Sequence, residues 1–131
     1  MPVDTKKFRA ELAVAEAKLY ADDLVKFHKK IHFEVLNRIV LRTPVDQGRA
    51  RANWQSSVNE IPSDQVLGLD VAGTATVVAG LQAISALPPF AVTYIMNNVP
   101  YIIPLEEGHS PQSPPGNMIA GSVAEVEVLL P

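Results

Sequence analysis

The chain has 131 residues, 47% of them hydrophobic and 19% charged, which is typical of one globular domain and excludes a disordered chain. It contains no cysteine, so disulfides and thiolate chemistry are excluded, and it has no stretch of about 18 apolar residues that would predict a membrane span. The net charge is only −3 and the N-terminus lacks the apolar core of a secretory signal, so we expect a soluble protein with no membrane partner.

Positive charge is confined to the first part of the chain. Residues 1–51 contain 11 basic and 7 acidic side chains, a net charge of +4. Residues 52–131 contain no basic and 7 acidic side chains, a net charge of −7. This division favours contact between a basic face of one subunit and an acidic face of the next, and contact of the basic part with nucleic acid is the alternative.

Apolar residues at three- and four-residue steps predict one long helix over residues 5–42, with Asp4 or Thr5 as its cap and Pro44 as its stop. The apolar stripe consists of Phe8, Leu12, Tyr20, Leu24, Phe27, Ile31, Val35 and Ile39. At about 1.5 Å per residue such a helix would be a rod of roughly 57 Å, longer than a domain of this size is wide. We therefore expect either a break near Asp22 and Asp23 or a first half that projects toward a partner.

The following residues predict a turn and a strand. Pro44 and Gly48 bracket the turn, and residues 51–61 then alternate weakly, as a strand with one wet face does, with Trp54 as a core anchor. A second strand is predicted over residues 90–98, which are rich in β-branched and aromatic side chains and end at two asparagines.

Shorter helical segments complete the predicted fold. Residues 72–87 predict a helix, and its expected buried face comprises Val77, Val78, Leu81 and Ile84. Residues 101–108 predict one helical turn closed by Gly108, whereas residues 117–131 fit a helix and a strand equally well. The predicted fold class is α+β, with a long N-terminal helix packed on a small, mainly antiparallel sheet and one or two further helices. We expect a single domain, 1–131, made of the helix 1–42 and an α+β core, 43–131, that includes a Pro-rich loop, 110–116.

His28 and His32 lie four residues apart on the predicted long helix, a spacing at which two histidines can share a metal ion. Lys29 stands where a hydrolytic zinc site would carry a glutamate, and its charge opposes a dication. We expect no metal, and two partly exposed histidines that flank the apolar stripe.

Glu106, Glu107 and His109 are the candidates for acid–base chemistry. Adjacent carboxylates in one short turn point in different directions, and no nucleophile elbow or phosphate-binding glycine loop accompanies them. The sequence therefore predicts no enzymatic activity and no cofactor.

Four arginines surround the predicted turn, opposed only by Asp46: they are Arg38, Arg42, Arg49 and Arg51. Because a guanidinium suits bidentate pairing with a carboxylate, we expect Arg49 or Arg51 to pair with Asp46 or with the two glutamates at 106 and 107, within or between subunits. Contact of these arginines and of Lys26, Lys29 and Lys30 with a DNA backbone is the alternative.

Two segments, "TPVDQGRARANW" and "NNVPYIIPLEEGHSPQSPPGNM", resemble the tail-completion, or neck, proteins of long-tailed bacteriophages, the group related to minor tail protein Z. That group carries a Thr-Pro-Val-Asp-x-Gly-Arg-x-Arg-x-x-Trp signature some way after an N-terminal helix. An Asn-Asn-x-x-Tyr-x-x-x-Leu-Glu-x-Gly-x-Ser segment and a Gln-x-Pro-x-Gly-Met-like turn follow, and order and spacing agree over nearly the whole chain.

The match is residue by residue. The first motif is matched by Thr43, Pro44, Val45, Asp46, Gly48, Arg49, Arg51 and Trp54. The second is matched by Asn97, Asn98, Tyr101, Leu105, Glu106, Gly108, Ser110, Gln112, Pro114 and Gly116. The chain departs from the group at Gln47, where threonine is usual, at Pro111, where a basic residue is common, and at Asn117, which separates Gly116 from Met118.

The resemblance implies a structural virion protein of the connector between capsid and tail, made in the host bacterial cytoplasm. It implies a homo-oligomeric ring of six subunits around the DNA channel, with tail terminator or tail tube proteins and head-closure or adaptor proteins as neighbours and DNA passing through the lumen. The residues expected at subunit or partner interfaces are Asp46, Arg49, Arg51, Asn98, Tyr101, Glu106, Glu107, His109, Pro114 and Pro115. The alternative function is a DNA-contacting accessory protein that uses the basic N-terminal half.

Overall fold

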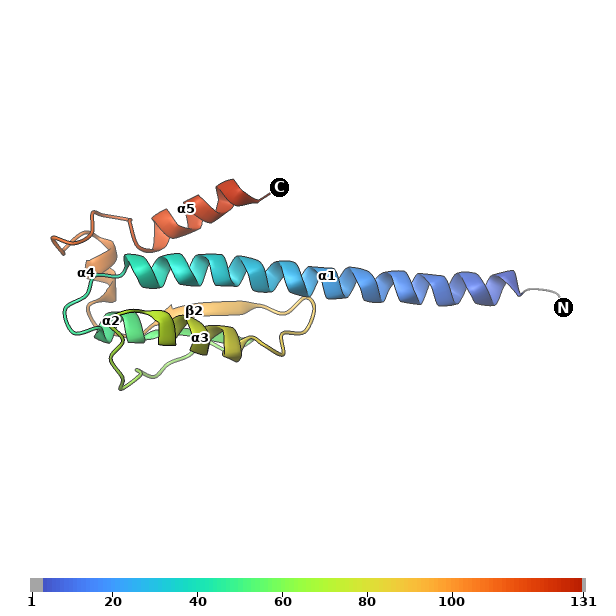
Figure 1. Cartoon of the computed structure of the whole chain (residues 1–131), viewed down its shortest axis with the longest axis horizontal. Helices are drawn as coiled ribbons and strands as arrows, with labels where there is room; N and C mark the ends of the chain where they lie inside the picture. The colour runs from blue at the N-terminus through green and yellow to red at the C-terminus, as the bar shows by residue number, and fades with distance from the viewer. Residues whose placement is uncertain (1–3, 131) are drawn as a thin grey trace.

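The computed structural model describes residues 4–130 and has an α+β fold built along one long helix (Figure 1). Helix α1 runs without interruption over Thr5–Arg42. The carboxylate of Asp4 accepts a hydrogen bond from the amide of Lys7 at 3.0 Å, which confirms the predicted cap. The helix ends at Thr43, whose hydroxyl donates to the carbonyl of Ile39 at 2.7 Å immediately before the proline at 44.

The predicted break near Asp22 and Asp23 is wrong, and the alternative of a projecting first half is correct. Residues 5–42 contain neither glycine nor proline, and alanine, leucine, lysine and glutamate, all strong helix formers, are frequent among them. The two aspartates are exposed, so they remain hydrated and do not interrupt the helix. In Figure 1 the first half of α1 extends well beyond the other elements.

The sheet has two antiparallel strands, β1 (Trp54–Val58) and β2 (Thr93–Asn97). Trp54 pairs with Asn97 and Val58 pairs with Thr93. Both strands are shorter than predicted, and the first starts at 54 because α2 (Arg49–Ala52) takes up the preceding residues in one helical turn.

The remaining elements are helices. Helix α3 covers Thr74–Ala83, α4 covers Ile102–Glu106, and α5 covers Ile119–Leu129, which settles the ambiguous C-terminal segment as a helix. The expected buried face of α3 is largely confirmed. Val77 is buried, Leu81 is half-buried, and Ile84 is buried just after the helix, whereas Val78 faces solvent. The C-terminal half of α1 lies between α5 on one side and the sheet with α2 and α3 on the other (Figure 1).

The core lies where these layers meet. Its buried cluster consists of Leu36, Ile39, Val40, Trp54, Val77 and Met118. Trp54 is the predicted anchor, and its indole N–H donates to the Thr43 hydroxyl at 2.7 Å. Gly80 lets α3 approach closely, since a Cβ there would lie 2.4 Å from Leu36 Cδ2 and 2.8 Å from Ser56 Oγ.

A polar network of histidines and hydroxyls joins α1 to both strands. His32 is buried, contrary to the expectation of two partly exposed histidines, and its ring nitrogens lie 3.0 Å from Thr93 Oγ1 and 2.7 Å from Ser56 Oγ. His28 Nε2 lies 2.9 Å from the same Thr93 hydroxyl. Burial, with a smaller contribution from the charge of His28, lowers the pKa of His32 to about 4. His32 therefore acts as a neutral, hydrogen-bonded core residue.

Within residues 4–130, no cluster of three or more histidine, cysteine or acidic side chains is suited to hold a metal ion. No helix in this part of the chain combines the length and apolar composition that crossing a membrane requires.

Candidate functional site

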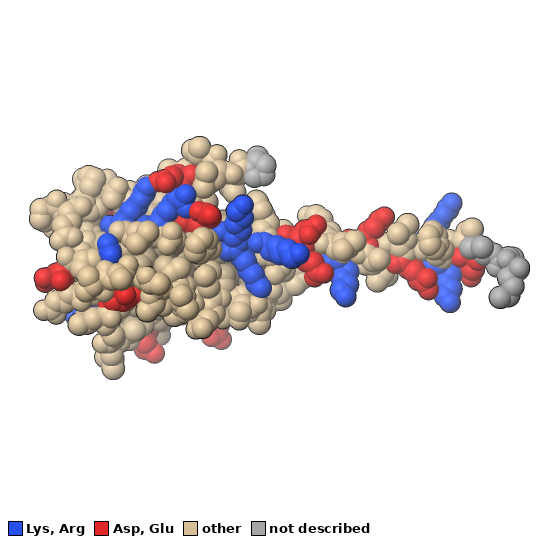
Figure 2. Space-filling model, in the orientation of Figure 1, with Lys and Arg blue, Asp and Glu red and all other residues tan. Residues whose placement is uncertain are grey.

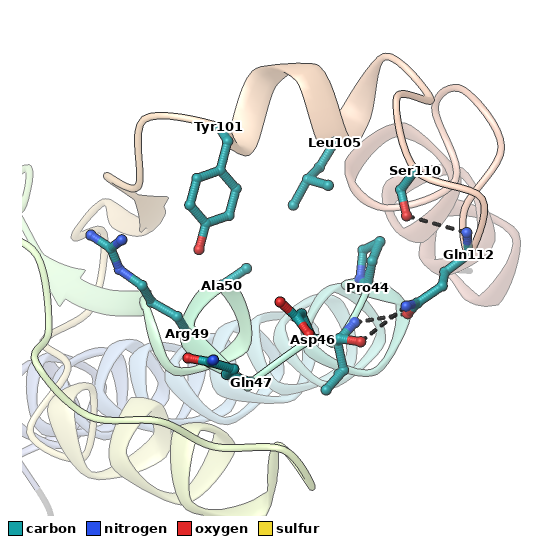
Figure 3. Close-up of a pocket in the computed structure, with 10 residues that line it drawn as sticks. Pro44, Asp46, Gln47, Arg49, Ala50, Tyr101, Leu105, Ser110 and Gln112 are labelled. Atoms are coloured by element: carbon teal, nitrogen blue, oxygen red, sulfur yellow. Dashed lines mark hydrogen bonds between the residues drawn. The ribbon is translucent and has the colours of Figure 1, made fainter.

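The two segments that carry the family resemblance line one cavity of about 390 Å³ at the end of the molecule where α1 stops (Figure 3). One wall comes from the turn after α1 and from α2, and the other from α4 and the loop behind it. The lining residues are Pro44, Val45, Asp46, Gln47, Arg49, Ala50, Tyr101, Leu105, Ser110 and Gln112. We refer to this cavity as the turn pocket.

Gly48 shapes the first wall. Its φ of 85° lies in the left-handed region, and a Cβ at this position would lie 2.6 Å from the amide nitrogen of Val71. The Gly48 carbonyl accepts hydrogen bonds from the amides of Ala52 and Asp70, both at 3.0 Å. The glycine thus starts α2 and joins it to the 59–73 loop, and α2 in turn carries Arg49 and Ala50 into the pocket.

Gln112 fastens the second wall to the first. Its side-chain oxygen accepts from the amide of Val45 at 2.9 Å, and its side-chain nitrogen donates to the carbonyl of Val45 at 2.9 Å (Figure 3). Tyr101, just before α4, and Leu105, within it, point into the space between the walls (Figure 3). Although Gln112 matches the second motif, its role as a cross-link could not be predicted, because the sequence does not show that it faces Val45.

Arg49 and Asp46 give the pocket its charge. The Arg49 guanidinium lies 5.9 Å from the centroid of the Tyr101 ring, at cation–π distance, and hydrogen-bonds to Gln65. Asp46 is exposed, and its carboxylate makes no hydrogen bond or ion pair with any residue from 4 to 130. The expected pairing of Arg49 with Asp46 or the glutamates at 106 and 107 is therefore absent within the described chain. The guanidinium instead contacts the ring of Tyr101 and the side-chain amide of Gln65.

Arg51 is held inside the fold. Its guanidinium donates to the carbonyls of Thr43 at 3.0 Å, Leu41 at 2.9 Å and Val71 at 2.6 Å. Two of these carbonyls belong to the end of α1 and its cap, where a cation is favourable. Arg51 therefore positions the turn; it does not line the pocket and forms no ion pair with a described carboxylate.

Glu106 caps the last helix. Its carboxylate accepts from the amide of Ile119 at 2.9 Å and from the amide of Ala120 at 3.0 Å, at the N-terminus of α5. The adjacent Glu107 is exposed and has no such partner among the described residues. One of the two adjacent carboxylates therefore has a structural role.

The other predicted site residues lie outside the pocket. Asn98 donates to the carbonyls of Pro62 at 2.9 Å and Asp64 at 3.1 Å, so it fixes the loop after β1. Pro114 and Pro115 are exposed on the Pro-rich loop, and His109 is exposed just before it. Of the ten predicted interface residues, the structure brings together Asp46, Arg49 and Tyr101 in the turn pocket.

Two ion pairs join α1 to α5. Arg38 pairs with Glu34 on its own helix and with Glu125 on α5, at 3.2 Å in the second case, and Arg42 pairs with the same Glu125. The hydrogen bond from Arg38, helped by the charge of Arg42, lowers the pKa of Glu125. The basic and acidic parts of the chain thus meet within one molecule, although through different residues from those predicted.

The turn pocket suits the docking of a protein segment. Tyr101 and Leu105 on one wall and Pro44 on the other contribute apolar surface, and Asp46 and Arg49 supply opposite charges. Ser110 Oγ accepts from the Gln112 amide at 3.2 Å, and within residues 4–130 no histidine or carboxylate is hydrogen-bonded to it as a general base would be.

Compared with family models, with curated proteins and with solved structures, the chain has no match.

Proposed function

We propose that this chain is a structural protein of the head–tail connector of a long-tailed bacteriophage, where it completes the tail and helps to join it to the DNA-filled capsid as a subunit of a ring. The observation that carries the proposal is the turn pocket. The two motifs on which the resemblance depends are separate in the sequence, and their residues line one cavity.

The chemistry of the pocket supports a docking role. Tyr101 and Arg49 are of the residue types that concentrate binding energy at protein interfaces, and Arg49 is exposed. Asp46 is left without an intrachain partner in the described structure, so it is available to a basic side chain of a neighbouring subunit. Contact between this pocket and a different surface of the next subunit would be heterologous, which is the kind of contact that closes into a ring.

The proline loop next to the pocket supports the same role. It is pinned to the turn by Gln112, and Pro115 packs against Gly108, where an added Cβ would lie 2.6 Å from Pro115 Cγ. A loop that is already ordered loses little conformational entropy when a partner binds it. The exposed residues Glu107, His109 and Pro114 then form the edge of the docking surface.

The DNA-contacting alternative is less well supported. Arg38 and Arg42 are paired with acidic residues, Arg51 is occupied by backbone carbonyls, and Lys29 donates to the carbonyl of Ser85 at 2.8 Å. Along the projecting half of α1, basic side chains alternate with acidic ones (Figure 2). On the face shown, the row of basic side chains over the globular part is interrupted by acidic ones, which weakens its attraction for a phosphate backbone (Figure 2).

The test uses the phage genome that carries this gene. We expect an early stop codon to leave filled heads and finished tails unjoined, as seen by electron microscopy. Asp46→Lys should reproduce this defect while the purified variant keeps its circular dichroism spectrum, because the exposed Asp46 carboxylate makes no hydrogen bond or ion pair in the described chain. The matched control is Asp64→Lys, an exposed aspartate outside the pocket. Joined, infectious particles at normal yield from the stop-codon strain would refute the proposed function.

A further inference from the structure

The projecting half of α1, residues 5–23, carries an uncovered apolar stripe. We call this segment the arm. Residues 5–20 are all exposed, and Phe8, Leu12 and Leu19 have 59%, 46% and 65% of their surface in contact with solvent. With Ala15 these residues follow four-, three- and four-residue steps, so they form one line along the helix.

Such a stripe is costly when left in water. Helices in folded proteins gain most of their stability from packing of an apolar face, and the arm has no packing partner within residues 4–130. Contiguous exposed apolar surface on a folded protein marks a site of contact with another molecule. The flanking charges indicate which molecule that is.

Each flank of the stripe carries one acidic and one basic residue. Glu11 and Lys18 lie on one flank, in that order along the chain, and Arg9 and Glu16 lie on the other. All of them are exposed, and none has a side-chain partner in the described structure. Along the chain, the acidic residue comes first on one flank and the basic residue comes first on the other.

This order fits a second copy of the arm in the antiparallel direction. When Phe8 faces Leu19 of the second copy and Leu12 faces its Ala15, helix geometry places Glu11 opposite Lys18. On the other flank the same register places Arg9 opposite Glu16 of the second copy. The two-fold axis repeats both pairs, and no like charges face one another along the flanks.

The flanking charges favour the antiparallel direction over the parallel one. A parallel arrangement places Glu11 opposite Glu16, and their repulsion offsets the attraction between Lys18 and Asp23 in that arrangement.

We propose that the free protein forms a two-fold dimer in which the arms of two copies pack antiparallel along Phe8, Leu12, Ala15 and Leu19. The dimer does not depend on the function proposed above. Its contact is isologous and uses the arm, whereas a ring needs a heterologous contact, so either proposal can fail while the other stands.

The first experiment measures the mass of the full chain by sedimentation equilibrium. A two-helix contact of this length falls among small, transient interfaces, so the protein concentration should reach the order of 0.1–1 mM. We expect a dimer at low salt that weakens as salt screens the flanking pairs. The variant Leu12→Asp/Leu19→Asp should be monomeric, and Val14→Asp, on the opposite side of the arm and 71% exposed, should remain dimeric.

Charge exchange tests the register. Lys18→Glu places two acidic residues opposite each other at both symmetry-related positions and should raise the dimer dissociation constant about tenfold or more. Glu11→Lys should have a similar effect, and the double variant Glu11→Lys/Lys18→Glu should restore most of the affinity, because the pairs are then merely reversed.

Cysteine cross-linking tests the direction, because the chain has no cysteine of its own. A mixture of Phe8→Cys and Leu19→Cys chains should form a mixed disulfide under mild oxidation. Leu19→Cys alone should not, since its two copies lie about 16 Å apart along the antiparallel pair. The proposal is overturned if the chain stays monomeric at 1 mM and low salt, if Leu12→Asp/Leu19→Asp still dimerises, or if Leu19→Cys cross-links with itself.

Discussion

Gln112 hydrogen-bonds to both backbone groups of Val45, accepting from the N–H and donating to the carbonyl at 2.9 Å in each case. These two hydrogen bonds resemble the backbone pairing between neighbouring β-strands, although one partner here is a side chain. It closes the loop 109–116 against the turn that follows α1, and the shape of the turn pocket depends on it.

Gln112→Ala should loosen that loop. Two hydrogen bonds at an exposed site contribute on the order of 1 kcal/mol in total, so we expect a small loss of global stability. Amide hydrogen exchange over residues 109–116 should rise markedly, because these amides depend on the local pairing. Gln82→Ala is the control, since Gln82 is exposed on α3 and its side chain has no hydrogen bond in the described structure. Unchanged exchange in the loop would contradict this role for Gln112.

Glu106 and Glu107 should differ sharply although they are neighbours. Glu106→Ala removes the carboxylate that accepts from the amides of Ile119 and Ala120, and the loss of such a cap costs about 1 kcal/mol. Glu107→Ala removes an exposed carboxylate without a described partner and should be nearly neutral. Urea unfolding of the two variants gives the comparison, and equal effects would exclude the capping role.

The burial of His32 predicts that the protein loses stability as the pH falls below neutrality. The pKa of His32 is about 4 in the folded state and 6.5 in the unfolded chain, so between these values the unfolded state binds the additional proton. Above pH 6.5 the histidine is neutral in both states and has no effect. Between pH 6.5 and pH 4 the free energy of unfolding should fall by up to about 3 kcal/mol.

The measurement is urea unfolding at pH 7.5, 6.0 and 4.5 for the native chain and for His32→Gln. The variant is expected to be less stable at pH 7.5, since it loses part of the network with Ser56 and Thr93, but its stability should depend less on pH. His109→Gln, at an exposed position, should keep the full dependence. A pH slope in His32→Gln equal to that of the native chain would assign the effect to other groups.

Gly80→Ala should destabilise the core by about 1–3 kcal/mol through overpacking, because its Cβ would lie 2.4 Å from Leu36 Cδ2. Gly68→Ala has no atom within 4 Å of its new Cβ and should be neutral or slightly stabilising. Thermal unfolding of both variants distinguishes steric crowding from the general effect of replacing glycine by alanine.

Local patterns were enough to predict most elements. The apolar periodicity of residues 5–42, the proline at 44 and the glycine at 108 all act through nearby residues, and the structure confirms the elements they predict. The break predicted at Asp22 and Asp23 was wrong. It was inferred from the length of the helix relative to the width of the domain, and the segment contains no glycine or proline that would interrupt a helix.

Partners distant in the sequence could not be predicted. Arg49 and Arg51 were expected to pair with carboxylates. They contact instead an aromatic ring, a side-chain amide and backbone carbonyls, and such groups are too common in any sequence to identify the partner. The pairing of Glu125 with α1 depends on a C-terminal segment that fits a helix and a strand equally well. Likewise, the sequence places His32 on a helix but does not show that Ser56 and Thr93 meet it.

The single long helix also has a consequence for how its two halves form. Starting a helix is the unfavourable step, whereas extending one residue by residue is nearly neutral for alanine- and lysine-rich sequence. The half that begins near His28 is held by the core, so it provides a nucleus from which residues 5–23 propagate. The arm should therefore fray progressively toward Thr5, with amide exchange rising along it, and the core-held half should be able to fold without it.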